Sequence, residues 1–244
     1  MRDYKSEEAL RVNWIKEKLQ KAGAKGIVFG NSGGKDCALV GILCKKACEK
    51  TIGVIMPCQS VVNYTSDTDD AKKVAEQFNI ETRIVDLSIV KEDMLTALRG
   101  KTNPDYYNLT AFANINPRLR MTTLYTIAQT EGCLVAGTGN RSEISMGYFT
   151  KWGDGGYDIN PIGDLTVREV YEFLAYFNAP QSIRSKKPSA GLWEGQTDEG
   201  EMGITYDEID DYLLNGVATP AVKERIDKNL NSTEHKRKLI IYPD

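Results

Sequence analysis

Short segments with few polar positions alternate with longer amphipathic segments through the first half of the chain. Segments of strand length lie at residues 26–30, 51–56, 82–86 and 133–136. Segments with the spacing or composition of helices lie at residues 6–22, 38–47, 67–77, 89–99 and 117–130. The second strand segment is apolar almost throughout, which is typical of a parallel sheet buried on both faces. This repeated order predicts an α/β fold with right-handed crossovers.

The order of the strands decides where a ligand can bind. We expect the first three strands to wind outward in one direction and the fourth to return to the other side of the first, which makes a doubly wound parallel sheet with flanking helices. A crevice then opens between strands one and four at their carboxyl ends. The loops that follow these two strands, at residues 30–37 and 137–143, are expected to face the same ligand.

The second half of the chain contains helices and one long irregular segment. Thr166 and Thr205 each precede a glutamate by three residues, which predicts two capped helices that end near Phe177 and Gly216. Between them, residues 184–203 are rich in glycine and charge and carry a tryptophan, a pattern typical of a lid over a site. We expect residues 1–244 to form a single α/β domain with a C-terminal lid loop and a helical tail.

Composition narrows the class of protein. The 244 residues, 41% of them hydrophobic, suffice for one sizeable core, and the net charge of −3 carries no basic footprint for nucleic acid. We expect no nucleic-acid partner, no membrane span and a cytoplasmic location, since the chain starts with charged residues and has no long apolar run. The five cysteines form no Cys-x-x-Cys pair, and the one histidine cannot complete a zinc set with them.

The loop after the first strand has the composition of a phosphate site. It reads Gly30, Asn31, Ser32, Gly33, Gly34, Lys35, Asp36 and Cys37. The two central glycines remove Cβ atoms that would block an anion, so loop amides and the free N–H groups of the next helix can bind it. The spacing differs from the longer P-loop, which argues against a kinase or GTPase. The alternative is an ordinary strand-to-helix turn whose aspartate favours the helix dipole.

Asp36 and Glu143 are expected to share a cation. An aspartate at a phosphate loop repels the bound phosphate unless a cation lies between the Asp36 carboxylate and that phosphate. The predicted crevice places Glu143 opposite Asp36. One carboxylate from each side could hold one Mg²⁺ on the bound phosphates. The alternative is a surface glutamate in the first turn of a helix.

Ser-Gly-Gly-x-Asp resembles the loop of enzymes that split ATP into AMP and pyrophosphate, a group that includes NAD synthetase, GMP synthetase and argininosuccinate synthetase. Cys37 stands where that group usually has a second serine, and its thiol is a poorer donor. Further segments resemble NAD synthetase in that family's order. They are Arg118-x-Arg120-Met121, 137–140 with Ser142-Glu143, 147–148, 150–151, 153–159, 187–193, 195–199 and His235-Lys236-Arg237. Together they extend over residues 26–238.

This resemblance implies an adenine-nucleotide alpha-hydrolase-like fold and a ligase of NAD biosynthesis. NAD synthetases use ATP to adenylate the nicotinate carboxylate of deamido-NAD, and ammonia then displaces AMP. Glutamine-dependent forms carry an amidase domain for which this chain has no room, so the resemblance implies use of ammonia itself. It also implies a homodimer, with the dinucleotide site at the subunit interface.

The same resemblance implies roles for individual residues. The loop from Gly30 to Cys37, with Thr138 and Ser189, would bind ATP, and Asp36 and Glu143 would bind Mg²⁺. Asp154 would accept a proton from ammonium, because only NH₃ is nucleophilic. The residues that would bind deamido-NAD are Arg118, Lys151, Asp158, His235 and Lys236.

One position departs from the family pattern. Val167 stands where the family commonly has a lysine that reaches the phosphates, and the neighbouring Arg168 would point about 100° away on a helix. Lys186 or Lys187 is the expected replacement. Two other functions stay open, namely another ATP pyrophosphatase, such as a tRNA-modifying or GMP-forming one, and a nucleotide sensor without catalysis. The absence of a basic surface disfavours another ATP pyrophosphatase. The presence of two carboxylates for the metal disfavours a nucleotide sensor.

Overall fold

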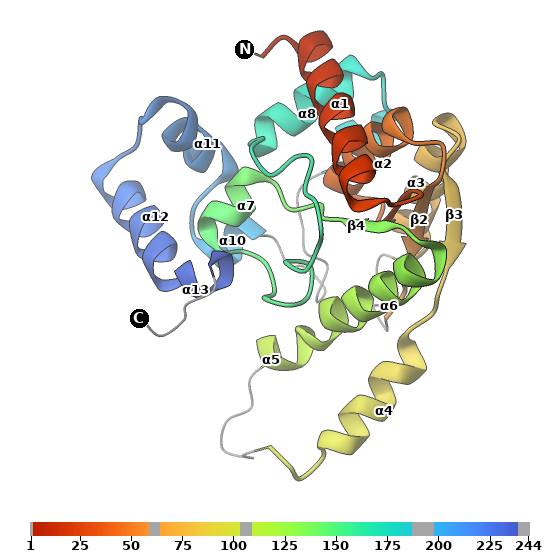
Figure 1. The fold of residues 1–244 in the computed structure, drawn as a ribbon. Coiled ribbons are helices and arrows are strands. Elements are labelled where there is room, and N and C mark those ends of the chain that lie inside the picture. The colour runs from red at the N-terminus through yellow and green to blue at the C-terminus, as the bar shows by residue number, and fades with distance from the viewer. Residues whose placement is uncertain (1, 59–63, 103–108, 187–197, 239–244) are drawn as a thin grey trace, which may run out of the picture.

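A computed structural model describes residues 2–58, 64–102, 109–186 and 198–238 (Figure 1). Its sheet consists of β1 (Ile27–Gly30), β2 (Thr51–Ile55), β3 (Glu81–Ile84) and β4 (Leu134–Ala136). All pairs are parallel, in the order β3-β2-β1-β4. This confirms the predicted doubly wound sheet, with the first and fourth strands adjacent.

Helices cover both faces of this sheet. One face carries α1 (Tyr4–Ala22), α2 (Lys35–Ala47), α3 (Tyr64–Gln77), α8 (Val167–Tyr176) and α9 (Gln181–Arg184); the other carries α6 (Ile115–Glu131), with α4 (Ser88–Leu98) and α5 (Leu109–Ala113) beyond it. Strand β1 serves both cores because its side chains alternate. Phe29 packs in the core under α1, α2 and α8, whereas Val28 packs with Leu124 of α6.

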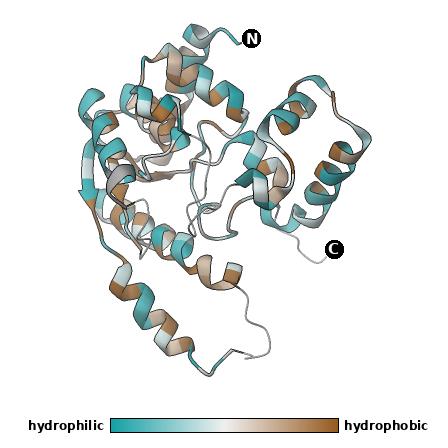
Figure 2. Ribbon diagram, turned by 180° about the vertical axis from the view of Figure 1, so that it is seen from behind, coloured by the Kyte–Doolittle hydropathy of each residue, from teal (hydrophilic) through white to brown (hydrophobic). Residues whose placement is uncertain are grey.

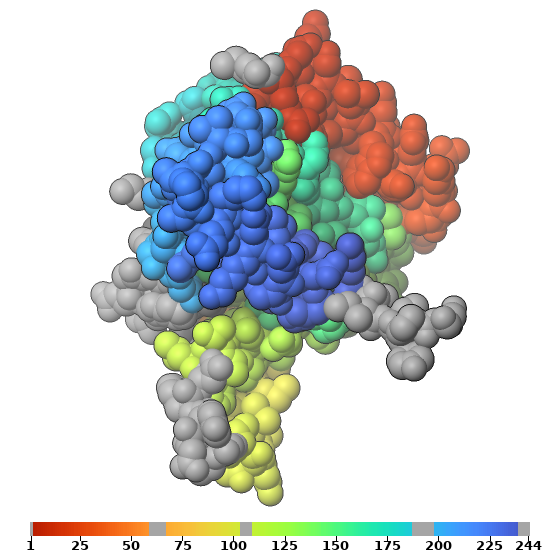
Figure 3. All heavy atoms as spheres, turned by 90° about the vertical axis from the view of Figure 1, so that its left-hand side faces the viewer, coloured from red at the N-terminus to blue at the C-terminus, as the bar shows by residue number. Residues whose placement is uncertain are grey.

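The C-terminal helices build a third core beside the sheet. They are α7 (Arg141–Met146), α10 (Asp198–Met202), α11 (Tyr206–Asn215), α12 (Pro220–Ser232) and α13 (Glu234–Arg237), and Figure 3 shows α11 to α13 covering one side of the molecule. Met146, Val167, Ile209 and Ile226 meet in this core. Both predicted capping boxes are present, at Thr166 and at Thr205. The core therefore attaches the helical tail to the start of α8.

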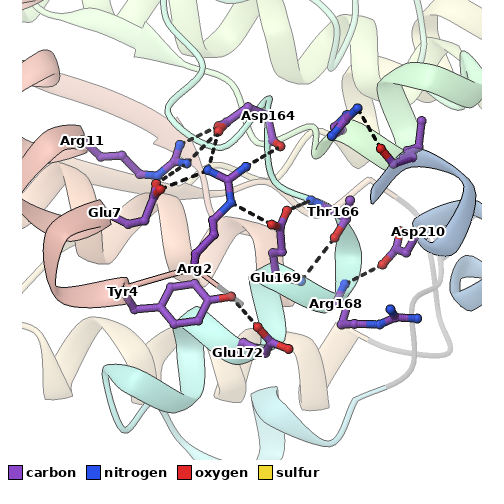
Figure 4. Close-up of polar contacts among 12 residues, drawn as sticks. Arg2, Tyr4, Glu7, Arg11, Asp164, Thr166, Arg168, Glu169, Glu172 and Asp210 are labelled. Carbon is purple, nitrogen blue, oxygen red and sulfur yellow. Dashed lines mark hydrogen bonds and ion pairs between the residues drawn. The ribbon is translucent and has the colours of Figure 1, made fainter. Parts of the chain in front are cut away.

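An ion-pair network attaches the first helix to α8 (Figure 4). Arg2 donates to Glu169 at 2.7 Å, and Arg11 donates to both Glu7 and Asp164. Glu169 is also the capping residue of α8, since it accepts from the backbone N–H of Thr166 at 2.9 Å. The N-terminal segment thus fixes the helix that starts beside the ligand site.

The prediction of an irregular segment at residues 184–203 was wrong in part. Residues 198–202 of this expected lid form helix α10, in which Asp198 and Met202 are buried, so tertiary packing stabilises a helix that local signals did not mark. Residues 109–113 form the short helix α5. The rest of the expected lid, 187–197, with Trp193, Lys187 and Ser189, lies outside the described residues. Among the described helices, none combines the length and apolar composition needed to cross a membrane.

Candidate active site

A cavity of about 600 Å³ lies at the carboxyl ends of β1 and β4. Its walls come from the loops after these strands, from α6, and from the segment at 147–156. The volume is within the range of small-molecule sites. The cavity brings together most of the expected ATP loop with Thr138, Glu143, Asp154 and Lys236.

The loop after β1 has a backbone shape that requires glycine at one position. Gly33 has φ +76°, and a Cβ there would lie 2.1 Å from the carbonyl oxygen of Asp67. The loop therefore lies directly against α3. Cys37, at the start of α2, is buried with its Sγ 3.1 Å from the Ser32 hydroxyl, and burial raises the pKa of its thiol. The side chain of Cys37 is a neutral packing group here, and the backbone N–H groups of Gly33 and Gly34 donate to the side chains of Asn31 and Ser32.

Asp36 and Glu143 are joined through a third residue, Asn140. The Asn140 amide donates to Asp36 Oδ1 at 3.1 Å, and the Asn140 backbone N–H donates to Glu143 Oε2 at 3.1 Å. Asn140 is the N-cap of α7 and Glu143 is the third residue of that helix. Glu143 thus lies in the first turn of α7, as one interpretation of the sequence expected, and it also faces Asp36, as the shared-cation interpretation expected.

The electrostatics of this pair are those of a cation site. Burial and the nearby Asp36 raise the pKa of Glu143 to about 8. Burial alone would lower the pKa of Lys35, but the Asp36 and Glu143 carboxylates outweigh it and raise that pKa. In the part of the chain that the structure describes, no three metal-binding side chains cluster. Two carboxylates nevertheless fit Mg²⁺, which takes its remaining ligands from phosphates and water.

Asp154 lies on the cavity wall at the end of a tight turn. The backbone N–H of Thr150 donates to its Oδ1 at 2.9 Å, and Lys236 is close enough to interact with its charge. Burial raises the pKa of Asp154, and these two neighbours oppose the rise. Lys236 itself donates to the carbonyl oxygens of Gly147 and Phe149 at 2.7 and 2.9 Å. The C-terminal α13 therefore holds the segment that carries Asp154.

Arg120 is a cavity residue to which the sequence assigned no role. Its Nε donates to the carbonyl oxygen of Met56 at 3.1 Å, and its side chain lines the cavity. Burial lowers the pKa of its guanidinium, and the nearby Asp154 carboxylate opposes that fall. The Arg120 side chain therefore lines the cavity near Asp154. In the sequence, the signal for a role of Arg120 was its position two residues after Arg118 in the segment Arg118-x-Arg120-Met121.

Four expected dinucleotide contacts lie elsewhere. Of the described residues, those lining the cavity do not include Arg118, Lys151, Asp158 or His235. Arg118 and His235 are exposed. The Asp158 carboxylate accepts from the Val135 backbone N–H at 2.8 Å and from the Tyr125 hydroxyl at 3.0 Å, which connects β4 to α6. Their roles toward deamido-NAD stay predictions.

Lys186, one of the two lysines expected to supply the positive charge missing at Val167, lies at the phosphate loop. Lys186 donates to the Gly33 carbonyl oxygen at 3.3 Å, to Asp67 at 2.6 Å and to Asp70 at 3.3 Å. Arg168 instead pairs with Asp211 at 2.9 Å, and Val167 is buried in the third core. The arrangement agrees with the expectation that Arg168 does not turn toward the phosphates.

Lys186→Ala is expected to raise the KM for ATP about tenfold, because loss of the ammonium leaves two carboxylates unneutralised beside the phosphate loop. Steady-state kinetics with varied ATP measures this. Lys73→Ala is the matched control, since Lys73 pairs with the same Asp70 but from the solvent side. An unchanged KM in Lys186→Ala would show that this lysine plays no part in binding ATP.

The chain is similar to known proteins both in sequence and in fold. The NAD synthase family profile matches residues 8–240. A curated relative, the NH₃-dependent NAD⁺ synthetase of Carboxydothermus hydrogenoformans, is 48% identical over 93% of each chain. Among solved structures, the NMN synthetase of Francisella tularensis superposes with a TM-score of 0.93 at 38% identity, covering 100% of both chains. The NH₃-dependent NAD synthetase of Campylobacter jejuni, in complex with the nitrate ion, superposes with a TM-score of 0.80 at 25% identity, also over 100% of both chains.

Proposed function

The chain belongs to the NAD synthase family, and from this premise we propose that it is an ammonia-dependent ligase that makes NAD from deamido-NAD. The nicotinate carboxylate attacks the α-phosphorus of ATP, and pyrophosphate leaves. Ammonia then attacks the acyl carbon of the adenylate, a C–N bond forms and AMP leaves. The substrates are ATP, deamido-NAD and ammonia.

One observation carries this proposal furthest: a single cavity contains both the phosphate loop with its carboxylate pair and Asp154. The two half-reactions need these parts in one place, because the acyl-adenylate made in the first is the substrate of the second. Mg²⁺, held by Asp36 and Glu143, would neutralise charge on the phosphates. Asn140 keeps the two carboxylates oriented.

Arg120 and Asp154 are assigned to the reacting end of the cavity. The Arg120 guanidinium lines the cavity near Asp154 and would stabilise negative charge that develops on the transferring phosphoryl group. Asp154 would take a proton from ammonium and so supply the nucleophile. Lys236 and Thr150 hold Asp154 in place and favour its charged form.

The proposal is tested by measuring pyrophosphate release with ATP and deamido-NAD, with and without ammonia. We expect release to require deamido-NAD and NAD to form only when ammonia is added. Glutamine at the same concentration, freed of contaminating ammonia, is the matched control and is expected to give no NAD. Failure to release pyrophosphate with deamido-NAD would overturn the assignment.

The solved structure with the TM-score of 0.93 supports a second candidate, because its name specifies NMN as the product. The chemistry would be identical, with nicotinate mononucleotide as the substrate in place of the dinucleotide. The two candidates are separated by comparing kcat/KM for deamido-NAD and for nicotinate mononucleotide. A preference of more than tenfold for the mononucleotide would assign the second function.

The rate of amide formation is expected to fall at low pH because of Asp154. Burial raises its pKa above the ordinary 3.8, so the carboxylate is protonated, and inactive as a base, at pH values where an exposed aspartate is still ionised. The rate is measured across pH with the ammonium concentration held constant and saturating. Asp154→Asn should lower the rate about a hundredfold or more and abolish this limb of the profile. A variant that keeps the wild-type profile would exclude Asp154 as the base.

We propose that two copies of the chain associate through the region around α4. Figure 2 shows hydrophobic residues along this helix, which projects from the body. The exposed apolar residues here are Ile84, Ile89, Val90, Met94 and Leu109. An apolar surface of this kind is expected to be covered by a partner, and the twofold homodimer implied by the family provides one.

The setting and organisation of the chain are also proposals. All five cysteines lie among the described residues and none forms a disulfide, which supports a cytoplasmic location. Contacts of α11 with α8 and of α12 with α7 support a single domain over residues 1–244.

A further inference from the structure

Lys35 is a buried lysine at an electrostatically unfavourable place. It is the first residue of α2, where the helix dipole favours anions over cations, and its side chain is only 6% exposed. Burying an ammonium is also costly unless specific partners compensate it. An ammonium that only contacts phosphate does not need to be buried in the free protein. The groups that surround the Lys35 ammonium therefore indicate its role.

Those partners are the carboxylates of the proposed metal site and two aromatic rings. Lys35 Nζ lies 2.7 Å from Asp36 Oδ2. It also lies 5.9 Å from the ring centroids of Tyr171 of α8 and of Tyr206 of α11, within the distance of a cation–π contact. Glu143 is near enough to interact with its charge. The ammonium therefore occupies the position of a small cation beside both carboxylates.

Both oxygens of Asp36 are engaged in this arrangement. Oδ1 accepts from the Asn140 amide at 3.1 Å and Oδ2 accepts from Lys35 at 2.7 Å. Asn140 is held by its capping contacts with Glu143, whereas Lys35 has a flexible four-carbon stem. The ammonium lies 2.7 Å from Oδ2, so it repels a divalent cation that binds Asp36, and this binding is favoured when the Lys35 side chain moves away.

We propose that Lys35 is a tethered counter-ion that keeps divalent cations from binding Asp36 and Glu143 until they arrive together with ATP. In the free protein the ammonium offsets one of the two carboxylate charges, so a metal ion alone meets a site that already holds a positive charge. When metal and nucleotide bind together, the phosphates supply new negative charge, and the ammonium leaves Asp36 to face them. This inference rests on the proposed function only in requiring a site for ATP and a divalent cation.

The test is the affinity of the nucleotide-free protein for Mn²⁺ alone, measured by calorimetry. Lys35→Met keeps the length of the side chain without its charge and is expected to bind Mn²⁺ at least about tenfold more tightly, because a repelling unit charge a few ångströms away is removed. Lys45→Met is the matched control. Lys45 lies on the same helix but pairs with Glu49 at the surface, so its variant should bind Mn²⁺ like the wild type.

Two further variants keep the test decisive. Lys35→Gln replaces Lys35→Met if thermal unfolding shows that the methionine variant does not fold, and the same gain is expected. In the double variant Lys35→Met with Asp36→Asn, the gain should disappear, because the carboxylate that binds the metal is gone. Unchanged or weaker Mn²⁺ binding in a folded Lys35→Met or Lys35→Gln protein would overturn the proposal. The wild-type assay with deamido-NAD separately tests the ligase function.

Discussion

Asp36→Asn and Glu143→Gln are each expected to reduce pyrophosphate release on the order of a thousandfold, because charge neutralisation at the phosphates contributes several kcal/mol to catalysis. Each change keeps the shape of the side chain and removes its charge. The two residues lie on different elements, α2 and α7, and meet only through Asn140. Loss of either carboxylate therefore disrupts one shared site.

The measurement is ATP-dependent pyrophosphate release with deamido-NAD at several Mg²⁺ concentrations. Asp227→Asn is the control, since the Asp227 carboxylate pairs with Lys223 at the surface of α12 and should not affect activity. Raising Mg²⁺ should restore part of the activity of each site variant, because the remaining carboxylate still binds the ion weakly. Wild-type turnover in either variant at ordinary Mg²⁺ would contradict the shared metal site.

Mixing two inactive variants is expected to restore activity if Arg118 serves the site of the partner subunit. Arg118 is exposed on α6 and lies outside the lining of its own cavity. In a dimer of Asp36→Ala and Arg118→Ala chains, one of the two sites combines an intact phosphate loop with an intact partner arginine. Random exchange makes half of the dimers mixed, so about a quarter of wild-type activity should return.

The experiment uses differently tagged chains, so that the mixed dimer is isolated before its activity is measured, and the isolated mixed dimer should show about half of the wild-type activity. Asp36→Ala mixed with Glu143→Ala is the control and should stay inactive, because both residues belong to the same chain's site. A verified mixed dimer of Asp36→Ala and Arg118→Ala without activity would refute the assignment of Arg118. Sedimentation that shows only monomer would remove the premise of the homodimer.

The phosphate loop was predictable from local chemistry, and the strand order from the general topology of doubly wound sheets. Gly33 and Gly34 in a strand-to-helix turn indicate an anion site. The apolar run at residues 51–56 indicates a strand that is covered on both faces. Asp36 and Glu143 follow adjacent strands of such a sheet, so their approach came from topology alone. The capped helices at Thr166 and Thr205 were visible for the same local reason.

Other local signals were present but not used. Thr219 caps α12 and Pro220 occupies its first turn, and Val222, Ile226 and Leu230 then recur at helical spacing. Asn140 with Glu143 is also a capping box, which marks the start of α7. These patterns would have located the helical tail and the residue that joins the two carboxylates.

The sheet, the phosphate loop and the pair of acidic residues follow from sequence patterns, because glycine conformation and apolar runs act over short stretches of chain and the sheet topology then sets which loops meet. Which charges meet depends on how the helices pack. Lys35 interacts with Glu143 and lies against rings from α8 and α11, and Arg120 rather than Arg118 lines the cavity. These contacts join residues far apart in the chain, and they depend on how helices pack over the sheet, which no local pattern specifies.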